Sequence, residues 1–468
     1  MQTRKTTFAV FFGNRGFFPA SLQESARREM AEVLEGLGHE VLSLDADVTR
    51  YGAVETPAEG ELYARFLQEN RGEYGGVILC LPNFGDETGA VAALKDAGVP
   101  ILIQAYPDEL DKMAPELRRD AFCGKFSIMD VFYQYDLQFT ALQPHTVHPR
   151  SAAFAENVDY FDRLCRVVGG MKDMVVGAIG ARTTAFKTVR IDELALQRHG
   201  ITMETLDLSG IFARVRALDG GDERLKAKLA TLRNYVSWEG VPGEAIDTLG
   251  RLGVVLDAVV EEYALDAVAI RCWLEMQEQL GISPCVLISE MNNRGVVTAC
   301  EVDVGNAVAM YGLHLASGQV STCLDWNNNY GDEPDKCILF HCGPVPQRLM
   351  TAKGRVVDHA ILANAVGEGR SWGCNVGRIK PGPFTYGSLM TEDGLLKFYL
   401  GEGRFTGDPI PDDFFGCGGV AEIEGLQDAL QTIGYGGYRH HTSVTPGRVL
   451  APVCEAFENY LGYEVTLL

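Results

Sequence analysis

Short apolar runs alternate with longer amphipathic stretches through the first third of the chain. The stretches between the runs carry apolar residues at helical spacing, and the runs are TFAVFFG (7–13), EVLSLD (40–45), GGVILCLP (75–82) and PILIQAY (100–106). Strands that are apolar throughout and separated by helices are typical of a parallel sheet covered on both faces. The pattern therefore predicts an α/β domain over residues 1–170.

The same alternation continues over residues 171–345, which we predict to form a second α/β domain. Its apolar runs are MVVGAIGARTTAF (174–186), ITMETLDLS (201–209), DAVAIRCW (266–273), SPCVLIS (283–289) and KCILFHCG (336–343). Glycine and proline become more frequent from residue 346, and residues 377–405 place short apolar runs between turn residues. That arrangement is typical of antiparallel β structure, so residues 346–468 are predicted to form a β-rich third domain.

Composition narrows the class of protein. A chain of 468 residues is long enough for two or three domains, and its net charge of −22 argues against a nucleic-acid or anionic-membrane partner. Apolar runs stay well below the ~20 residues that span a bilayer. The twelve cysteines lack CxxC spacing, which favours reduced thiols, several of them small core residues. We expect a cytoplasmic protein.

Two acidic residues each follow an apolar, strand-like run. Glu301 follows GVVTAC, Asp325 follows QVSTCL, and the segment between them reads as one helix. In a βαβ unit both strands run the same way, so both carboxylates are expected at one edge of a sheet, where they could chelate a cation. The alternative is that Glu301 caps the following helix and Asp325 begins a solvated turn.

Histidines can complete such a site. His341 follows a third apolar run, CILF, and is expected at the same edge. His440 and His441 are adjacent in GGYRHHTSVTPG, and only one of two neighbouring residues in a strand faces inward. Glu301, Asp325, His341 and one C-terminal histidine would make an oxygen and nitrogen ligand set that suits Mn²⁺ or Mg²⁺ and could hold Zn²⁺ or Co²⁺.

At these residues the sequence resembles the L-fucose isomerase/L-arabinose isomerase superfamily. In the fucose branch a Glu and an Asp 24 positions apart bind Mn²⁺ with a C-terminal His, and positions 301 and 325 are 24 apart. His341 and His441 match histidine ligands of the arabinose branch, and HHTSVTPG keeps its HHT. Residues 377–405 and the segment CGKFSIMDVF (123–132) also resemble family segments.

The resemblance implies two consecutive Rossmann-like or flavodoxin-like α/β domains followed by a barrel-like C-terminal domain. It also implies a homo-oligomer, a hexamer or a trimer-based assembly. The active site would lie between the second and third domains and be capped by a neighbouring subunit's first domain. The segment after Asp325, WNNNYGDEPD, matches the sugar-binding residues of neither branch, which leaves the sugar open.

The expected activity is a Mn²⁺-dependent aldose–ketose isomerisation of a deoxyhexose, pentose or sulfonated hexose through a cis-enediol. Glu301 and Asp325 would hold the metal and carry the protons, His441 would complete the site, and His341 would bind the metal or support it. The candidate substrate contacts are Arg15, Lys125, Trp326 and Asn327.

Two other classes of protein fit part of the pattern. Tandem α/β domains also occur in sugar-binding and regulatory proteins, which have no need of a cation held by Glu301, Asp325 and His441. A metal-dependent sugar epimerase or aldolase would use the same ligands and a similar enediol-like intermediate.

Overall fold

The structure is a computed structural model that describes residues 4–19 and 21–468. It contains two compact units: one holds residues up to 169 together with 455–462, and the other holds 170–454 together with 463–468. Helix α5 (Ala152–Met171) belongs to both. The predicted domain boundaries after residues 170 and 345 stay predictions.

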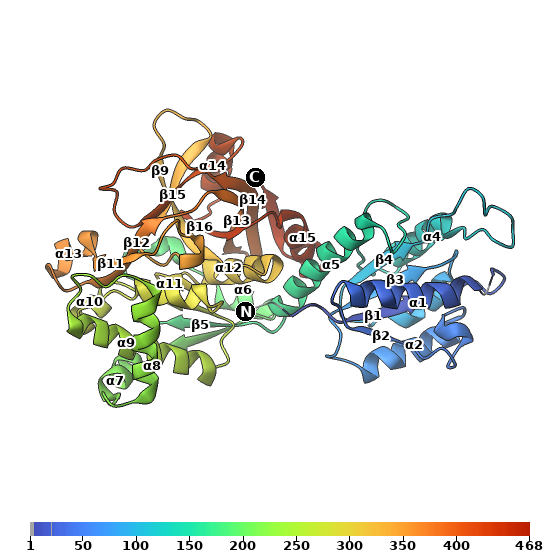
Figure 1. Ribbon diagram of the computed structural model, residues 1–468, viewed down its shortest axis with the longest axis horizontal. Helices are drawn as coiled ribbons and strands as arrows, with labels where there is room; N and C mark the ends of the chain where they lie inside the picture. Colours follow the sequence, from blue (N-terminus) through green and yellow to red (C-terminus); the bar gives the residue numbers. More distant parts are fainter. Residues whose placement is uncertain (1–3, 20) are drawn as a thin grey trace. The chain divides into compact units, whose positions relative to one another are not determined.

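The N-terminal unit is built on a four-stranded parallel sheet of order β2-β1-β3-β4. Its strands are β1 (Phe8–Phe12), β2 (Val41–Ser43), β3 (Gly76–Leu81) and β4 (Ile101–Ala105). Every residue of β1, β3 and β4 is buried, because helices cover the sheet (Figure 1). These helices are α1 (Ser21–Gly36), α2 (Pro57–Glu69), α3 (Glu87–Leu94), α4 (Ala121–Gln134) and α5; a short η1 turn spans Arg50–Gly52.

A second parallel sheet, of order β6-β5-β7-β8, follows in the other unit. Its strands are β5 (Val175–Ile179), β6 (Thr202–Leu206), β7 (Ala267–Ile270) and β8 (Val297–Cys300). Helix α12 (Val304–Ser317) packs against β5, β7 and β8. The other helical segments are η2 (Lys187–Val189), α6 (Glu193–Arg198), α7 (Leu208–Ala217), α8 (Glu223–Tyr235), α9 (Gly243–Glu262), α10 (Glu275–Leu280) and α11 (Cys285–Asn293).

The same unit contains a nine-stranded sheet that closes into a barrel. The ring runs β15-β10-β9-β16-β13-β14, and pairing of β14 with β15 closes it. The strands are β9 (Thr322–Asn329), β10 (Lys336–His341), β11 (Arg355–Asp358), β12 (Trp372–Arg378), β13 (Gly382–Glu392), β14 (Leu395–Phe405), β15 (Cys417–Glu422), β16 (His441–Pro446) and β17 (Glu464–Leu467). The helical segments are η3 (Gln347–Leu349), α13 (Ala360–Val366), α14 (Leu426–Tyr435), α15 (Leu450–Glu455) and η4 (Ala456–Tyr460).

The predicted mixed α/β architecture with parallel sheets and a barrel-like C-terminal region is confirmed. The finer prediction that the α/β regions are Rossmann-like or flavodoxin-like stays a prediction. None of the helices in the described part of the chain combines the length and apolar character that crossing a membrane requires.

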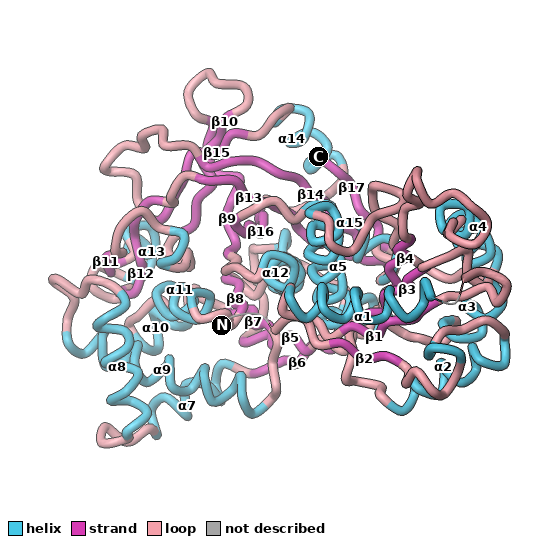
Figure 2. Tube along the Cα trace, turned by 45° about the vertical axis from the view of Figure 1, so that its right-hand side comes forward, coloured by secondary structure: helices cyan, strands magenta, loops and turns pink. Residues whose placement is uncertain are grey.

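One topological prediction is wrong. Strands β8 and β9 do not form a βαβ unit: β8 belongs to the parallel sheet, whereas β9 pairs antiparallel with β10 and β16 in the barrel. The second half of β9 is polar and becomes exposed, as in an antiparallel strand with one solvated face. The end of β8 nevertheless lies near β9 (Figure 2).

Candidate functional site: a carboxylate–imidazole cluster

Glu301 lies in the turn that joins β8 to α12. Glu301 and Val302 have backbone φ values of 63° and 57°, in the left-handed region, which costs a non-glycine residue about 1–3 kcal/mol. The next residue, Asp303, caps α12 by accepting a hydrogen bond from the Asn306 backbone N–H at 3.1 Å. This tight turn begins the helix at once and brings the Glu301 carboxylate beside the barrel strand that holds His441.

The other predicted ligands come from three neighbouring barrel strands. Asp325 pairs in register with His441 of β16 on one side and with Phe340 of β10 on the other. His341 is the last residue of β10. Asp325 lies within β9 and not at a strand end as predicted, because β9 continues into a longer antiparallel strand.

The predicted metal ligands converge. His441 Nε2 lies 2.9 Å from Glu301 Oε2 and 3.3 Å from Asp325 Oδ1. The rings of His341 and His441 have centroids 5.8 Å apart, and one ligand atom each from Glu301, His341 and His441 lies within 4.8 Å of the others. The oxygen and nitrogen ligand set predicted from the sequence therefore shares one location.

Four atoms of this cluster have unused hydrogen-bonding capacity. Glu301 Oε2, Asp325 Oδ1, His341 Nε2 and His441 Nε2 are buried and have no hydrogen-bond partner among the described residues. Leaving a buried polar atom unsatisfied costs roughly 1–3 kcal/mol. A divalent cation would satisfy all four at once, so the residues present fit the metal that the sequence predicts.

A further carboxylate, which the sequence analysis missed, holds His441 in place. Asp303 is fully buried and its Oδ2 lies 2.7 Å from His441 Nδ1. Its Oδ1 accepts a hydrogen bond from the buried guanidinium of Arg439. A carboxylate on one imidazole nitrogen fixes the ring and directs the other nitrogen toward a metal. The sequence signal was available, since Asp303 directly precedes an apolar helical run, as capping residues do.

Trp273 orients the carboxylate of Glu301. Its indole N–H donates to Glu301 Oε1 at 2.9 Å, which leaves Oε2 on the side of His441. Phe186, in the loop after β5, packs edge-on against Trp273 and His440. Neither aromatic residue was predicted from the sequence, because each stands outside the acidic and histidine motifs.

The two carboxylates differ in their electrostatics. Burial opposes ionisation of Glu301, but its contact with His441 holds the pKa of Glu301 below the ordinary value. Burial raises the pKa of Asp325 above its ordinary value. For Asp303 burial also works against the charge, yet Arg439 holds its pKa well below the ordinary range. Glu301 therefore keeps its charge more firmly than Asp325.

A cavity of about 360 Å³ opens over the cluster. Glu301, Asp325 and His341 line it together with Trp273 and Asn327. This volume lies within the roughly 300–1,000 Å³ of small-molecule sites, and a few convergent polar groups in a partly apolar wall are typical of them.

The two predicted substrate contacts on β9, Trp326 and Asn327, differ in whether they face the cavity. Asn327 lines the cavity. Trp326 packs edge-on against Tyr386 in the barrel, and its indole N–H donates to the Tyr399 hydroxyl at 3.1 Å. The structure thus gives Trp326 a packing role, and its stacking on a sugar stays a prediction.

Arg15 and Lys125 lie in the N-terminal unit. Arg15 pairs with Glu87 and donates to the Gly85 carbonyl at 2.7 Å. Lys125 is almost fully buried and donates to the His145 carbonyl at 2.9 Å, and burial lowers its pKa to about 8. Their substrate contacts also stay predictions.

The fold and site define an α/β protein with a carboxylate–imidazole cluster where a parallel sheet meets a closed barrel. Residues 9–172 match the family model for the fucose/sulfoquinovose isomerase N-terminal domain. Residues 339–468 match that for the L-fucose isomerase C-terminal domain. The two matches cover more than half of the chain, and the chain belongs to the fucose isomerase-like superfamily, as the resemblance predicted.

Two proteins with sequences similar to this chain are sulfoquinovose isomerases. A sulfoquinovose isomerase from Priestia aryabhattai is 22% identical over 453 residues, covering 94% of this chain and 94% of that protein. A sulfoquinovose isomerase from Alkalicoccus urumqiensis is 23% identical over 279 residues, covering 59% of this chain and 61% of that protein.

Proposed function

We propose that this protein is a metal-dependent aldose–ketose isomerase that acts on a sulfonated hexose through a cis-enediol. The observation that carries the proposal is a cluster of four buried, unsatisfied polar atoms, of which those of Glu301, Asp325 and His341 belong to residues that line one sugar-sized cavity. Membership of a family of sugar isomerases supports the reaction class. The names of the two relatives favour a sulfonated hexose over the deoxyhexoses and pentoses that the sequence left open.

Glu301, Asp325 and His441 would hold the metal, with His341 as a fourth ligand. Mn²⁺ suits this oxygen and nitrogen donor set, and Mg²⁺, Co²⁺ or Zn²⁺ are possible alternatives. When bound, a divalent cation neutralises the negative charge that develops on the two neighbouring sugar oxygens. Asp303 would keep the His441 ring in the orientation that presents Nε2 to the site.

The two cavity carboxylates would carry the protons. One removes the proton from C2 of the aldose and returns it to C1, while the other moves the hydroxyl proton from O2 to O1. No electron leaves the sugar, so the steps balance without an oxidant. The Trp273 indole would keep Glu301 aimed at the sugar during both transfers, and either carboxylate could take either role.

The test is a substrate panel with and without metal. Chelator-treated protein would be assayed with Mn²⁺ on a sulfonated hexose, a deoxyhexose and a pentose, and the products identified by NMR. We expect a ketose from the sulfonated hexose only when metal is present. Turnover that is independent of metal would contradict the proposal, an epimer would favour an epimerase, and binding without turnover would favour a sugar-binding protein.

Substitutions test whether the two cavity carboxylates are required for turnover. Glu301→Gln and Asp325→Asn should each lose turnover by at least ~100-fold, since each acid serves as both ligand and proton carrier. Asp332→Asn, an exposed acid in the β9–β10 turn, is the matched control and should retain activity. Near-normal turnover of both cavity variants would refute the assignment.

Light scattering would test the proposed hexameric or trimer-based assembly.

A further inference from the structure

Five of the twelve cysteines gather beside the cavity, although the sequence gives no paired spacing. Cys272 and Cys300 have their Sγ atoms 3.5 Å apart. Cys285 Sγ lies 3.6 Å from Cys342 Sγ and 3.9 Å from Cys374 Sγ. The five come from separate elements, at the ends of β7, β8 and β10, at the start of α11 and within β12, so only the fold brings them together.

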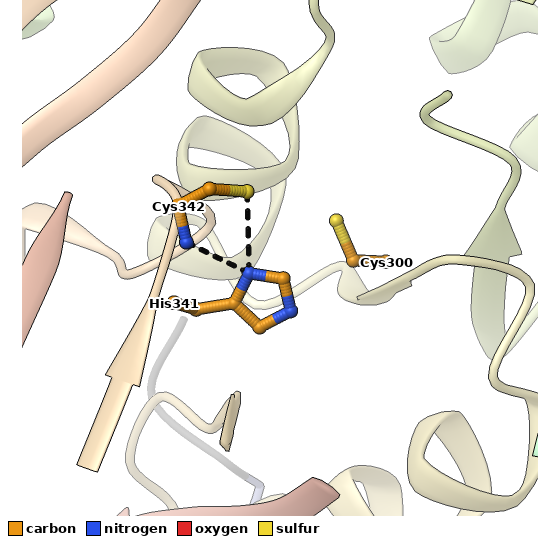
Figure 3. Close-up of side chains that lie close together, drawn as sticks. All are labelled: Cys300, His341 and Cys342. Atoms are coloured by element: carbon orange, nitrogen blue, oxygen red, sulfur yellow. Dashed lines mark hydrogen bonds between the residues drawn. The ribbon is translucent and has the colours of Figure 1, made fainter. Parts of the chain in front are cut away.

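An imidazole joins the sulfur atoms. His341 Nδ1 lies 3.3 Å from Cys342 Sγ and accepts a hydrogen bond from the Cys342 backbone N–H at 2.9 Å. One ligand atom each from Cys300, His341 and Cys342 lies within 4.8 Å of the others. Figure 3 shows the thiols of Cys342 and Cys300 near the same edge of the His341 ring. Cys285, in contact with Cys342, supplies a third sulfur atom.

The spacing of these sulfur atoms suits a thiophilic ion. Zinc binds thiolates at ~2.3 Å in tetrahedral geometry, which places two sulfur ligands roughly 3.8 Å apart. The 3.6 Å between Cys285 and Cys342 is close to that separation. Zinc can be held by three protein ligands with its fourth position left to solvent.

An ion can reach these thiols from the cavity. Cys272, Cys285 and Cys342 line it together with His341, and Cys342 is partly exposed. Other thiols of the barrel, such as Cys337, are buried outside this group. Reduced thiols that merely fill a core need neither an imidazole at hydrogen-bond distance nor access from a cavity.

We propose that Cys300, Cys342 and Cys285 form a second metal site beside the His341 ring, for a thiophilic divalent ion such as Zn²⁺. It differs in chemistry from the carboxylate–imidazole cluster, because its protein donors are all thiols. The proposal does not rest on the isomerase activity, because it concerns binding at thiolates.

Cobalt distinguishes the two sites spectroscopically. Co²⁺ would be titrated into the reduced full-length chain without oxygen, and thiolate-to-cobalt charge transfer would be followed in the near ultraviolet. Carboxylates and imidazoles give no such band. We expect one thiolate-bound Co²⁺ per chain, displaced by Zn²⁺. A titration without the band would overturn the proposal.

Variants assign the ligands. Cys300→Ala and Cys342→Ala should remove the band, whereas Cys337→Ala, in the same strand as His341, and Glu301→Gln should retain it. A band that survives both of the first two substitutions would overturn the assignment.

Alkylation of the wild-type chain gives a test that no folding defect can obscure. Zn²⁺ should slow modification of Cys342 by iodoacetamide at least tenfold and leave the exposed Cys123 unaffected. Equal modification of Cys342 with and without Zn²⁺ would also overturn the proposal.

Discussion

Replacing Asp303 by asparagine removes one charge from the centre of the site with almost no change in shape. The carboxylate bonds the buried Arg439 guanidinium through Oδ1 and the His441 ring through Oδ2. Its Oδ2 also accepts a hydrogen bond from the Asn306 amide at 2.6 Å. Asparagine caps helices as well as aspartate does, so the α12 cap should survive.

The energetic consequence follows from burial. Arg439 is only 4% exposed and Asp303 is fully buried, so Asp303→Asn leaves a guanidinium charge without its partner in a low-dielectric interior. Breaking a buried ion pair from one side costs about 3–5 kcal/mol. That is a large part of the ~5–15 kcal/mol by which proteins are stable. Loss of the carboxylate behind His441 should also weaken Mn²⁺ binding by roughly 10–100-fold.

A double-mutant cycle separates the two effects. Denaturant unfolding would give stability and calorimetric titration the Mn²⁺ affinity, with Asp207→Asn, an exposed helix cap, as matched control. Asp303→Asn with Arg439→Met should regain at least ~2 kcal/mol over Asp303→Asn alone, because no charge is left unpaired. Its Mn²⁺ affinity should stay low, because His441 still lacks its carboxylate. The reasoning is refuted if Asp303→Asn unfolds within about 1 kcal/mol of wild type, or if the second substitution restores no stability.

Three further predictions concern other positions. Since burial lowers the pKa of Lys125 to about 8 from 10.5, the unfolded chain binds more protons between these pH values and wild-type stability rises with pH there. Lys125→Met should therefore be more stable than wild type in thermal unfolding at pH 7, and this difference in the free energy of unfolding should shrink by about 3 kcal/mol by pH 10.5; a difference that does not change with pH contradicts this. Trp273→Phe removes the indole donor to the cavity carboxylate and should lower kcat/KM roughly 10–100-fold, whereas an unchanged value would rule out orientation by the indole. Gly124→Ala places a Cβ 2.0 Å from the Phe84 carbonyl oxygen and should destabilise by about 1–3 kcal/mol in denaturant unfolding, while Gly36→Ala, with open space around it, should not; equal stability of the two variants would contradict the packing argument.

Local patterns were sufficient to identify the residues of the carboxylate–imidazole cluster but not the fold that brings them together. Each of Glu301 and Asp325 follows an apolar run, and that signal is contained in a few neighbouring residues. Which sheet a strand joins depends on pairing with distant segments, and the polar residues after Asp325 were the only local indication that β9 belongs to the barrel. The predicted βαβ unit was wrong for that reason, although the convergence it was meant to explain is present.

The groups that support the site were beyond local patterns. Asp303 and Arg439 are 136 positions apart, and neither residue alone indicates a buried ion pair. The same holds for Cys285 and Cys342, which are 57 positions apart and meet only when α11 packs beside the end of β10. Long-range pairs of this kind follow from tertiary packing and leave no periodicity in the sequence.

The strained turn at Glu301 and Val302 explains why Asp303 must be held so firmly. Two successive left-handed non-glycine residues cost about 1–3 kcal/mol each, and such a turn persists only if its surroundings leave no alternative. Trp273 fixes one side through the Glu301 carboxylate. Arg439 and His441 fix the other through Asp303. The ion pair therefore does more than neutralise a buried charge: it anchors the end of the turn, so that the free oxygen of Glu301 remains beside His441.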